Sequence, residues 1–505
     1  MCVLSFTESM AENHAVAIEE ATDALTFDHW IDGASVLAAD DEEFETTDPA
    51  VIQPIAPVAR GRAADIDRAV EAAQVAFENE WGTTTPRERA RVIREWVATL
   101  RDHVEELALL ESLDTGKPLP HARDELEDAF EYLEYYVSVA QAHKGAHLPE
   151  GNDNHVYIRN EPYGVAGQIL PWNYPLNLFG WKVGAALAAG NTVVCKPSEE
   201  APLSITRAAQ LSTGVLPDGV LNVVNGYGTE AGAPLTEHAG VDKLSFTGSV
   251  PVGKQVMQAA ADHVTPVTLE LGGKSPFVVF PDADIEGAAE TSAAGIFYNA
   301  GQSCDACSRI LVHEAVREEF TDAFLEATSA WKPGDPLADG TTMGPLTFGD
   351  QYEKVTDYVS VGETEGATLV RGGDSPGGDL AAGHFMKPTV FDDVDNEMRI
   401  AQEEIFGPVE TIIGFSDYEE AIELANDIDY GLAAGVATSD VATAHRAAAD
   451  IEAGSIWINE YHGAGPGIPF GGFKDSGIGR ECAKEALDEY THTKSVNIAL
   501  DDPQI

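Results

Sequence analysis

Hydrophobic residues recur at helical spacing in three segments of the first third of the chain. The pattern predicts helices from Ala63, from Pro86 and over residues 121–142. Thr84 or Thr85 can cap the second helix, because proline fits the first turn, where no backbone N–H is needed. Residues 1–27 are acidic and weakly patterned, so we expect a partly ordered extension there.

Beyond residue 160 the pattern changes to short apolar strands separated by helical stretches. Strands are expected at 165–170, 192–196, 220–225 and 242–248, and in a second series at 275–280, 309–314, 389–391 and 411–415. Strands that alternate with helices are typical of parallel βαβ units. No Gly/Ser linker separates the two series, so the predicted domains share a broad interface. Residues 493–499 alternate like an edge strand that another subunit could cover.

Length and charge narrow the class of protein. The chain has 505 residues, of which 44% are hydrophobic, which is typical of a globular protein with two or three domains. It carries 30 Lys+Arg against 85 Asp+Glu, a net charge of −55, which makes nucleic acids and anionic membranes poor partners. Because the acidic residues are spread along the chain, we expect a solvated acidic surface suited to a salt-rich cytoplasm. A moderately acidic enzyme of ordinary salinity is the alternative.

The number and spacing of the cysteines argue against a disulfide-stabilised secreted protein and against a metal-stabilised fold. The five cysteines are Cys2, Cys195, Cys304, Cys307 and Cys482, an odd number without the spacing of a disulfide framework. Cys304 and Cys307 form a C-x-x-C pair, but no second pair or suitably spaced histidines accompany it, so we expect no metal site. No basic start, apolar signal or run of about 20 apolar residues occurs, so we expect a cytoplasmic protein without a membrane span.

Three short segments carry residues suited to catalysis. Cys304 follows the small-residue turn Gly301-Gln302-Ser303, which can expose the thiol and, if electropositive, lower its pKa. Glu270 ends a predicted strand and can act as a general base, and Asn173 lies between two prolines, where its amide can donate to an oxyanion. Taken singly, each has an ordinary alternative: a buried apolar cysteine, a surface glutamate and a capping asparagine.

Two other strand ends are suited to binding a nucleotide. In Phe246-Thr247-Gly248-Ser249, a strand enters a helix whose first N–H groups form an anion site. Lys196 and Glu199, which flank Ser198, can hold the hydroxyls of a ribose. The glycines of segment 226–232 are one residue too widely spaced for G-x-G-x-x-G, so a tight turn is the simpler interpretation there.

Together these segments resemble the ordered motifs of the NAD(P)-dependent aldehyde dehydrogenase superfamily. The motifs are PWNYPL, KPSE, FTGS, LELGGKSP, GQSC, EEIFGPV and PFGGFKDSGIGRE, spread over residues 28–500. The resemblance implies an α/β fold with a Rossmann-like NAD-binding domain (1–141 and 163–272) and an α/β catalytic domain (273–474). It also implies a small β oligomerisation arm and C-terminal segment (142–162 and 475–505), and hence a homodimer or homotetramer.

The same resemblance implies catalytic roles. Cys304 is similar to the nucleophile that attacks the aldehyde carbon. Asn173 and the backbone N–H of Cys304 are similar to the groups that hold the oxyanion. Glu270 is similar to the base that activates the deacylating water, with activation of the thiol as a further role, and its presence favours hydrolysis over transfer to phosphate or CoA. Lys182 and Glu481 resemble a buried proton path. Because Cys304, Glu270 and Asn173 are all present, a non-catalytic binding protein of this fold is disfavoured. Cys307 has no family role and is interpreted as packing.

The cofactor contacts also follow from the resemblance. Lys196 and Glu199 match the residues that bind the adenosine ribose, and Ser249 matches the pyrophosphate contact. Glu404 matches the contact to the nicotinamide ribose, with Phe406 packed beside it. Because Glu199 accepts from a 2′-hydroxyl but repels a 2′-phosphate, NAD is favoured, with NADP as the alternative because Lys196 offsets the repulsion. The further positions are Leu170, Pro171, Trp172, Ser198, Gly228, Gly232, Phe246, Thr247, Gly248, Leu271 and Gly272.

Four aromatic residues are expected at the aldehyde entrance: Tyr174, Trp181, Tyr298 and Phe470. They could cage a quaternary ammonium, each contact contributing about 0.5–2 kcal/mol, with Glu460 adding attraction. That pattern resembles the betaine aldehyde dehydrogenases. The alternatives are a channel for ordinary aliphatic or aromatic aldehydes and a semialdehyde site, the latter disfavoured because no arginine occurs in these segments.

Overall fold

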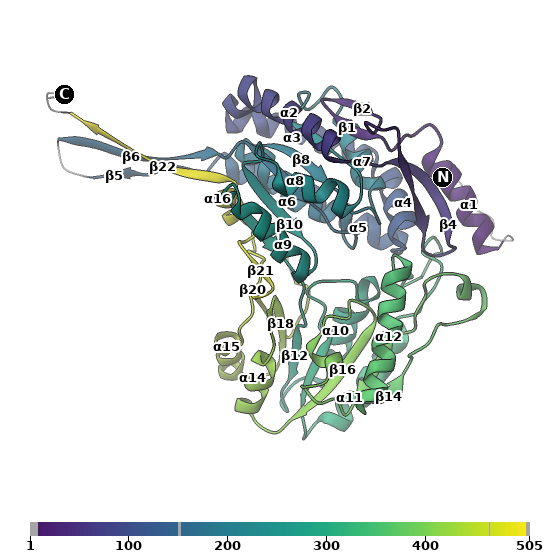
Figure 1. Ribbon diagram of the computed structural model, residues 1–505. Coiled ribbons are helices and arrows are strands. Elements are labelled where there is room, and N and C mark those ends of the chain that lie inside the picture. Colours follow the sequence, from purple (N-terminus) through teal and green to yellow (C-terminus); the bar gives the residue numbers. More distant parts are fainter. Residues whose placement is uncertain (1–8, 150–152, 464, 501–505) are drawn as a thin grey trace.

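Two large sheets organise the chain, and the computed structural model describes residues 9–149, 153–463 and 465–500 (Figure 1). The first sheet has the order β2-β1-β9-β8-β7-β10-β11-β21. Its five central strands are parallel; β1 and β21 pair antiparallel with the outer two of them, β9 and β11, and β2 pairs antiparallel with β1. The bounds are β1 His29–Ile31, β2 Ala34–Val36, β7 Val165–Ile169, β8 Thr192–Lys196, β9 Leu221–Val223, β10 Lys243–Thr247, β11 Val267–Glu270 and β21 Gly477–Ile478.

The order of the central strands creates a crevice at one edge of this sheet. The chain runs outward from β7 through β8 to β9 and then resumes on the other side of β7 with β10 and β11. In such sheets ligands bind beyond the carboxyl ends of the strands where the direction reverses. Here that point lies between Ile169 and Thr247, the last residues of β7 and β10.

Helices cover both faces of the first sheet. They are α2 Ala63–Asn79, α3 Pro86–Asp102, α4 Val104–Thr115, α5 Leu119–Ala140, α6 Pro175–Ala189, α7 Leu203–Gln210, α8 Ala233–Glu237, α9 Val250–Ala261 and α16 Glu485–Glu489. Thr85 caps α3 by accepting from the Glu88 N–H at 3.3 Å, with Pro86 in the first turn, as the sequence indicated. The helical stretch that starts at Pro86 is divided at His103, where ψ of 18° ends α3 before α4 begins.

The second sheet carries the order β14-β15-β16-β13-β12-β18-β19 and is parallel except for β14. Its strands are β12 Pro276–Val279, β13 Arg309–His313, β14 Thr368–Arg371, β15 Thr389–Asp392, β16 Val409–Phe415, β18 Ala433–Ala437 and β19 Ser455–Ile458. Its helices are α10 Ile285–Phe297, α11 Arg317–Ala327, α12 Gly349–Glu365, α13 Arg399–Gln402, α14 Tyr418–Asn426 and α15 Val441–Asp450. The sequence pattern missed β18, whose AAGVA segment has small side chains and little alternation, although it is buried throughout.

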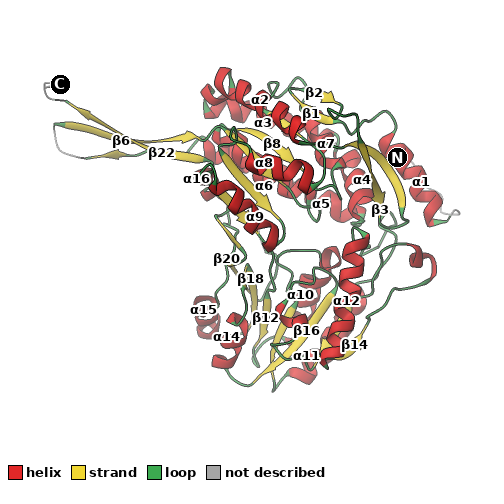
Figure 2. Ribbon diagram, viewed as in Figure 1, coloured by secondary structure: helices red, strands yellow, loops and turns green. Residues whose placement is uncertain are grey.

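A three-stranded arm projects from the body of the molecule (Figures 1 and 2). It consists of β5 His147–Leu148, β6 Asn154–Pro162 and β22 Thr491–Ala499. β22 pairs antiparallel with β6 over its whole length and forms the edge of the arm, so the prediction of an edge strand at 493–499 is confirmed. Two short pairings complete the described strands, β3 Glu43–Asp48 with β4 Gln53–Ala59 and β17 Tyr430–Gly431 with β20 Phe473–Lys474.

The N-terminal segment is more ordered than its sequence pattern indicated. Residues Met10–Thr22 form helix α1, which buries His14, Ala17 and Ala21. The apolar residues on the buried face of α1 are alanines, whose small side chains give only a weak helical pattern of hydrophobicity in the sequence. Residues 1–8 of the predicted extension lie outside the described residues. Within the part of the chain that is described, no helix is long and apolar enough to cross a membrane.

Candidate active site

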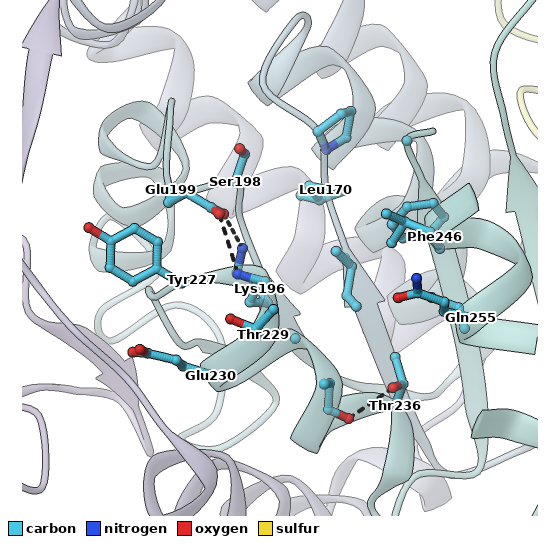
Figure 3. A pocket seen from close by; sticks show the side chains of 18 of the residues that line it. Leu170, Lys196, Ser198, Glu199, Tyr227, Thr229, Glu230, Thr236, Phe246 and Gln255 are labelled. Carbon is cyan, nitrogen blue, oxygen red and sulfur yellow. Dashed lines mark hydrogen bonds and ion pairs between the residues drawn. The ribbon is translucent and has the colours of Figure 1, made fainter. Parts of the chain in front are cut away.

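Two adjoining cavities lie beyond the carboxyl ends of β7, β8 and β10. The larger has a volume of about 710 Å³ (Figure 3) and the smaller about 160 Å³, and Pro171, Trp172, Thr247 and Gly248 line both. Every cofactor position expected from the sequence lines one of them. The larger also takes in Leu170, Lys196, Ser198, Glu199, Gly228, Gly232 and Phe246, and the smaller Ser249, Leu271, Gly272, Glu404 and Phe406.

The larger cavity contains a partly buried ion pair. Lys196 Nζ lies 2.8 Å from Glu199 Oε2, and the Gly228 N–H donates to Glu199 Oε1 at 3.3 Å. Burial alone raises the pKa of Glu199, but the Lys196 ammonium outweighs it, so the pKa of Glu199 is lowered. The carboxylate is therefore ionised and able to accept from a hydroxyl group. Figure 3 shows the pair facing into the cavity.

The segment 226–232, interpreted from the sequence as a tight turn, has a more specific structure. Gly228–Gly232 forms one π-helical turn that continues into α8. It lines the larger cavity together with Tyr227 and with Arg60, which lies beyond the end of β4. Sequence reasoning missed Arg60, which belongs to no recognisable motif, and Glu230, whose segment was interpreted as a tight turn.

Cys304 follows a strained turn. Asn299, Ala300 and Gly301 all have positive φ (50°, 54° and 73°), and a Cβ at Gly301 would lie 2.1 Å from the Gly407 carbonyl oxygen. The turn places Cys304 in the wall of the smaller cavity with Asn173 and Glu270, so the three predicted catalytic residues come together. The expected lowering of the thiol pKa is wrong: burial, reinforced by Asp305 and Glu270, raises the pKa of Cys304. The thiol therefore needs a proton acceptor.

Glu270 is placed to be that acceptor. Its side chain is buried, and neither carboxylate oxygen has a hydrogen-bond partner among the described residues. Burial raises the pKa of Glu270 well above its ordinary value, and the Glu481 carboxylate raises it further. A carboxyl group shifted in this way can take up and release a proton nearer neutral pH.

Asn173 is held through both its side chain and its backbone. Its Nδ2 donates to the Gln302 carbonyl at 3.0 Å, while its own backbone carbonyl accepts from Asn299 Nδ2 and Lys117 Nζ, each at 3.1 Å. An amide carries two N–H groups, so one remains for a ligand. Lys117 and Asn299 were not anticipated, and Lys117 is itself buried between Glu111 and Glu125.

Lys182 and Glu481 meet behind the site although 299 residues separate them. Lys182 Nζ lies 2.6 Å from Glu481 Oε1 and 3.1 Å from Ser245 Oγ, with both charged side chains buried. Because Glu481 raises and Lys182 lowers the pKa of Glu270, this pair is electrostatically linked to the candidate base.

The far wall of the smaller cavity is built from Glu404 and its neighbours. Glu404 Oε1 accepts from the Gly273 N–H at 3.0 Å, and burial raises the pKa of Glu404. The Phe406 ring meets Trp172 edge-on at 5.3 Å. Gln351 and Lys354 also line this wall and were not anticipated from the sequence.

The four aromatic residues expected at the aldehyde entrance make different ring contacts, although Tyr174, Trp181 and Phe470 pack in one hydrophobic cluster with Cys304. Trp181 and Phe470 meet edge-on at 5.4 Å, whereas Tyr298 stacks on His121 at 4.7 Å and Lys117 Nζ lies 4.6 Å from the Tyr174 ring centroid. None of the four lines either cavity described above. Glu460, expected to attract a cation, is exposed.

Cys307 is buried, and its Sγ donates to the Ser292 carbonyl at 3.2 Å, as suits a packing role. The four cysteines that the structure describes are all free. Across residues 9–149, 153–463 and 465–500, no group of three or more His, Cys, Asp or Glu side chains is arranged to hold a metal ion.

Comparison with known proteins gives consistent matches over nearly the whole chain. The model of the aldehyde dehydrogenase family matches residues 36–496. An aldehyde dehydrogenase from Aspergillus niger is 44% identical over 475 residues, covering 94% of this chain and 95% of that protein. Among solved structures, the NAD+ complex of an aldehyde dehydrogenase from Bacillus cereus has a TM-score of 0.93 at 44% identity, covering 95% and 98% of the two chains. Betaine aldehyde dehydrogenase from Staphylococcus aureus in complex with NAD+ has a TM-score of 0.95 at 39% identity, covering 97% and 98%.

Proposed function

Since the chain belongs to the aldehyde dehydrogenase family and is therefore an NAD(P)-dependent oxidoreductase, we propose that it oxidises an aldehyde to the carboxylic acid with NAD. One observation carries the proposal. A nucleophile, an amide donor and a buried base, which are Cys304, Asn173 and Glu270, line one cavity that adjoins a larger cavity with an ionised Lys196–Glu199 pair.

The residues of the two cavities fit NAD. Glu199 accepts from the hydroxyls of the adenosine ribose, and the first N–H groups of α9 with Ser249 take the pyrophosphate. Thr247 Oγ1 is buried without a hydrogen-bond partner in the described part of the chain and lines both cavities, as expected of a ligand contact. Glu404 serves the second ribose. When bound, NAD accepts the hydride that the aldehyde carbon loses.

The first half of the reaction uses Cys304, Glu270 and Asn173. Glu270 takes the thiol proton, and the sulfur attacks the aldehyde carbon to give a thiohemiacetal whose oxygen carries the negative charge. The Asn173 amide and the Cys304 N–H donate to that oxygen. Since the pKa of the thiol is raised by burial, the transfer of its proton to Glu270 is a required step.

In the second half, loss of the hydride leaves a thioester on Cys304. Glu270 then accepts a proton from water, whose oxygen attacks the thioester carbon, so that the carboxylic acid leaves and the sulfur regains a proton. Glu270 can do this only when it is ionised. Lys182 and Glu481 set the field at this carboxylate and provide the path by which its proton leaves.

For the substrate we propose betaine aldehyde or a related amino-aldehyde, supported by the Trp181–Phe470 pair and by the likeness to the betaine aldehyde dehydrogenase structure. Broad specificity for aliphatic, aromatic or semialdehyde substrates is the alternative. It is favoured by the Lys117 ammonium, which already occupies one face of Tyr174 and would repel a cationic substrate there.

A comparison of betaine aldehyde with hexanal separates these cases. NAD reduction is measured in concentrated KCl for the wild type and for Cys304→Ala, which should be inactive with both. A preference of tenfold or more in kcat/KM for betaine aldehyde supports the amino-aldehyde. Equal kcat/KM values for the two aldehydes contradict the amino-aldehyde proposal but not the proposed reaction. Activity that survives Cys304→Ala contradicts the mechanism.

We further propose that the arm formed by β5, β6 and β22 joins subunits into a homodimer or homotetramer. The exposed edge of β22 offers unpaired backbone groups to another chain. The net charge of −55 supports a salt-rich cytoplasm as the setting of the enzyme, because screening relieves the repulsion between its carboxylates.

A further inference from the structure

An arginine–glutamate pair forms part of the wall of the larger cavity. Arg60 Nε donates to Glu230 Oε2 at 2.8 Å and Arg60 Nη2 donates to Glu230 Oε1 at 2.6 Å, a two-pronged contact. Both side chains line the cavity, and both are about one-third exposed. This contact uses one edge of the guanidinium, and Nη1 on the other edge lies 3.4 Å from Glu42 Oε2.

The Arg60–Glu230 pair lies beside Lys196 and Glu199, the proposed contacts to the adenosine ribose. The Arg60 guanidinium is 5.1 Å from the Tyr227 ring centroid, and the next residue, Gly228, donates its N–H to Glu199. Arg60, Tyr227, Gly228 and Glu199 thus follow one another along the same wall. In Figure 3, Tyr227, Glu230 and Glu199 lie on the same side of the cavity, with Lys196 next to them.

The charges along this wall are balanced without a ligand. Arg60 also lies 3.4 Å from Glu42, and Arg62 is bound by Asp40 and Glu42. A phosphate group beside Glu199 would therefore meet carboxylates together with cations that are already paired. A neutral hydroxyl avoids this cost.

We propose that Glu230 withholds Arg60 from the cofactor's 2′-position, so that the Arg60–Glu230 pair is a determinant of NAD over NADP in addition to Glu199. This inference rests on the proposed NAD site. If Glu230 is made neutral, the Arg60 fork is released and can turn along Tyr227 toward a 2′-phosphate, which matches its geometry with two hydrogen bonds.

Binding of adenosine 2′,5′-bisphosphate and of 5′-AMP, measured by calorimetry at one fixed ionic strength, isolates the 2′-phosphate without any turnover. The comparison uses Glu230→Gln and Glu237→Gln. Glu237 lines the same cavity and forms no ion pair in the part of the chain that is described, so its variant measures the effect of one lost charge. We expect Glu230→Gln to favour the bisphosphate over AMP by about tenfold more than Glu237→Gln does.

The gain must depend on Arg60. The double variant Arg60→Ala/Glu230→Gln should lose it and return to the ratio of the Glu237→Gln control. A gain that persists in the double variant, or no gain beyond the control, overturns the inference. Glu230→Ser replaces Glu230→Gln if circular dichroism shows that the latter is unfolded.

The same experiment keeps the two proposals apart. If the wild type binds neither nucleotide, the proposed NAD site is contradicted. If it binds AMP but the variants leave the ratio of bisphosphate to AMP affinity unchanged, only the proposed role of Glu230 is contradicted. Steady-state kcat/KM for NADP relative to NAD should then shift in the same direction as the binding ratio.

Discussion

His14 in α1 joins three parts of the molecule, and replacing it should remove a pH-dependent clamp. Its Nδ1 lies 2.5 Å from Asp48 Oδ2 of β3, and its Nε2 lies 2.9 Å from Asp335 Oδ1 in the loop that follows α11. The ring is fully buried. The N-terminal helix, which precedes the segment matched by the family model, is thereby attached to the β3–β4 strand pair and to the loop after α11.

The size of the effect follows from the pKa of His14. Burial lowers it, but the hydrogen bonds and charges of Asp335 and Asp48 outweigh burial and raise the pKa from 6.5 to about 9. At about 1.4 kcal/mol per pKa unit, the protonated ring stabilises the folded state by on the order of 3 kcal/mol. Because the pKa is raised on folding, this contribution is complete below the unfolded value of 6.5 and disappears as the pH rises through about 9.

Hydrogen exchange of the α1 amides in wild type and His14→Gln provides the assay. The exchange rates of the two proteins are compared at the same pH, so the intrinsic pH dependence of exchange cancels. We expect the protection that the wild type has over the variant to fall by about 100-fold between pH 6.5 and pH 9.5, which corresponds to about 3 kcal/mol.

Two further variants provide a second test of the His14 contacts and a control. Asp335→Asn should remove part of the pH dependence, because one carboxylate is lost while Asp48 stays. His238→Gln, which removes a partly exposed contact with Asp67 and does not involve α1, should leave α1 unchanged. If wild type and His14→Gln give parallel protection profiles across this pH range, the clamp is refuted.

Four other outcomes test the site and the assembly. Glu270→Gln should slow both the first equivalent of NADH and the later steady turnover about 10²–10⁴-fold, seen by rapid mixing, because both halves of the reaction use this carboxylate; an unchanged steady rate would contradict the role of the base. Lys182→Met should lower the free energy of unfolding by about 3–5 kcal/mol in urea titrations, and Lys182→Met/Glu481→Leu should recover most of it, because the lone buried carboxylate is removed. A chain ending at Tyr490 should sediment as a monomer; an unchanged sedimentation coefficient would exclude the arm as the interface. Activity should persist in molar KCl and decline in dilute buffer, and a flat salt profile would exclude adaptation to salt.

Part of the cofactor site could be predicted from the residues themselves because it sits in short segments at strand ends, whereas positions such as Glu404 and Phe406 followed from the family resemblance. A parallel sheet brings the carboxyl ends of its strands to one edge, so KPSE after β8 and FTGS after β10 have to meet there. The structure accordingly places every one of these positions along the two cavities.

Features that depend on distant side chains could not be predicted in this way. Arg60 and Glu230 are 170 residues apart, and Lys117 reaches the Asn173 carbonyl from a different helix end. The direction of the Cys304 pKa shift depends on burial, which the GQSC segment does not reveal. The aromatic residues of the expected entrance could be named from the sequence, whereas the partners of two rings, Lys117 beside Tyr174 and His121 stacked on Tyr298, could not.

The net charge of −55 gives a misleading view of how this protein meets an anionic cofactor. Five of its thirteen lysines are almost completely buried: Lys117, Lys182, Lys196, Lys243 and Lys274. Lys196 lines the larger cavity, and the partly buried Lys354 lines the smaller. A nucleotide bound here would thus meet Lys196, Lys354 and the N-terminal N–H groups of α9. Because interactions inside a cavity are screened far less than those at the surface, these few cations decide binding there, and the acidic surface decides only how the molecule behaves toward salt and other macromolecules.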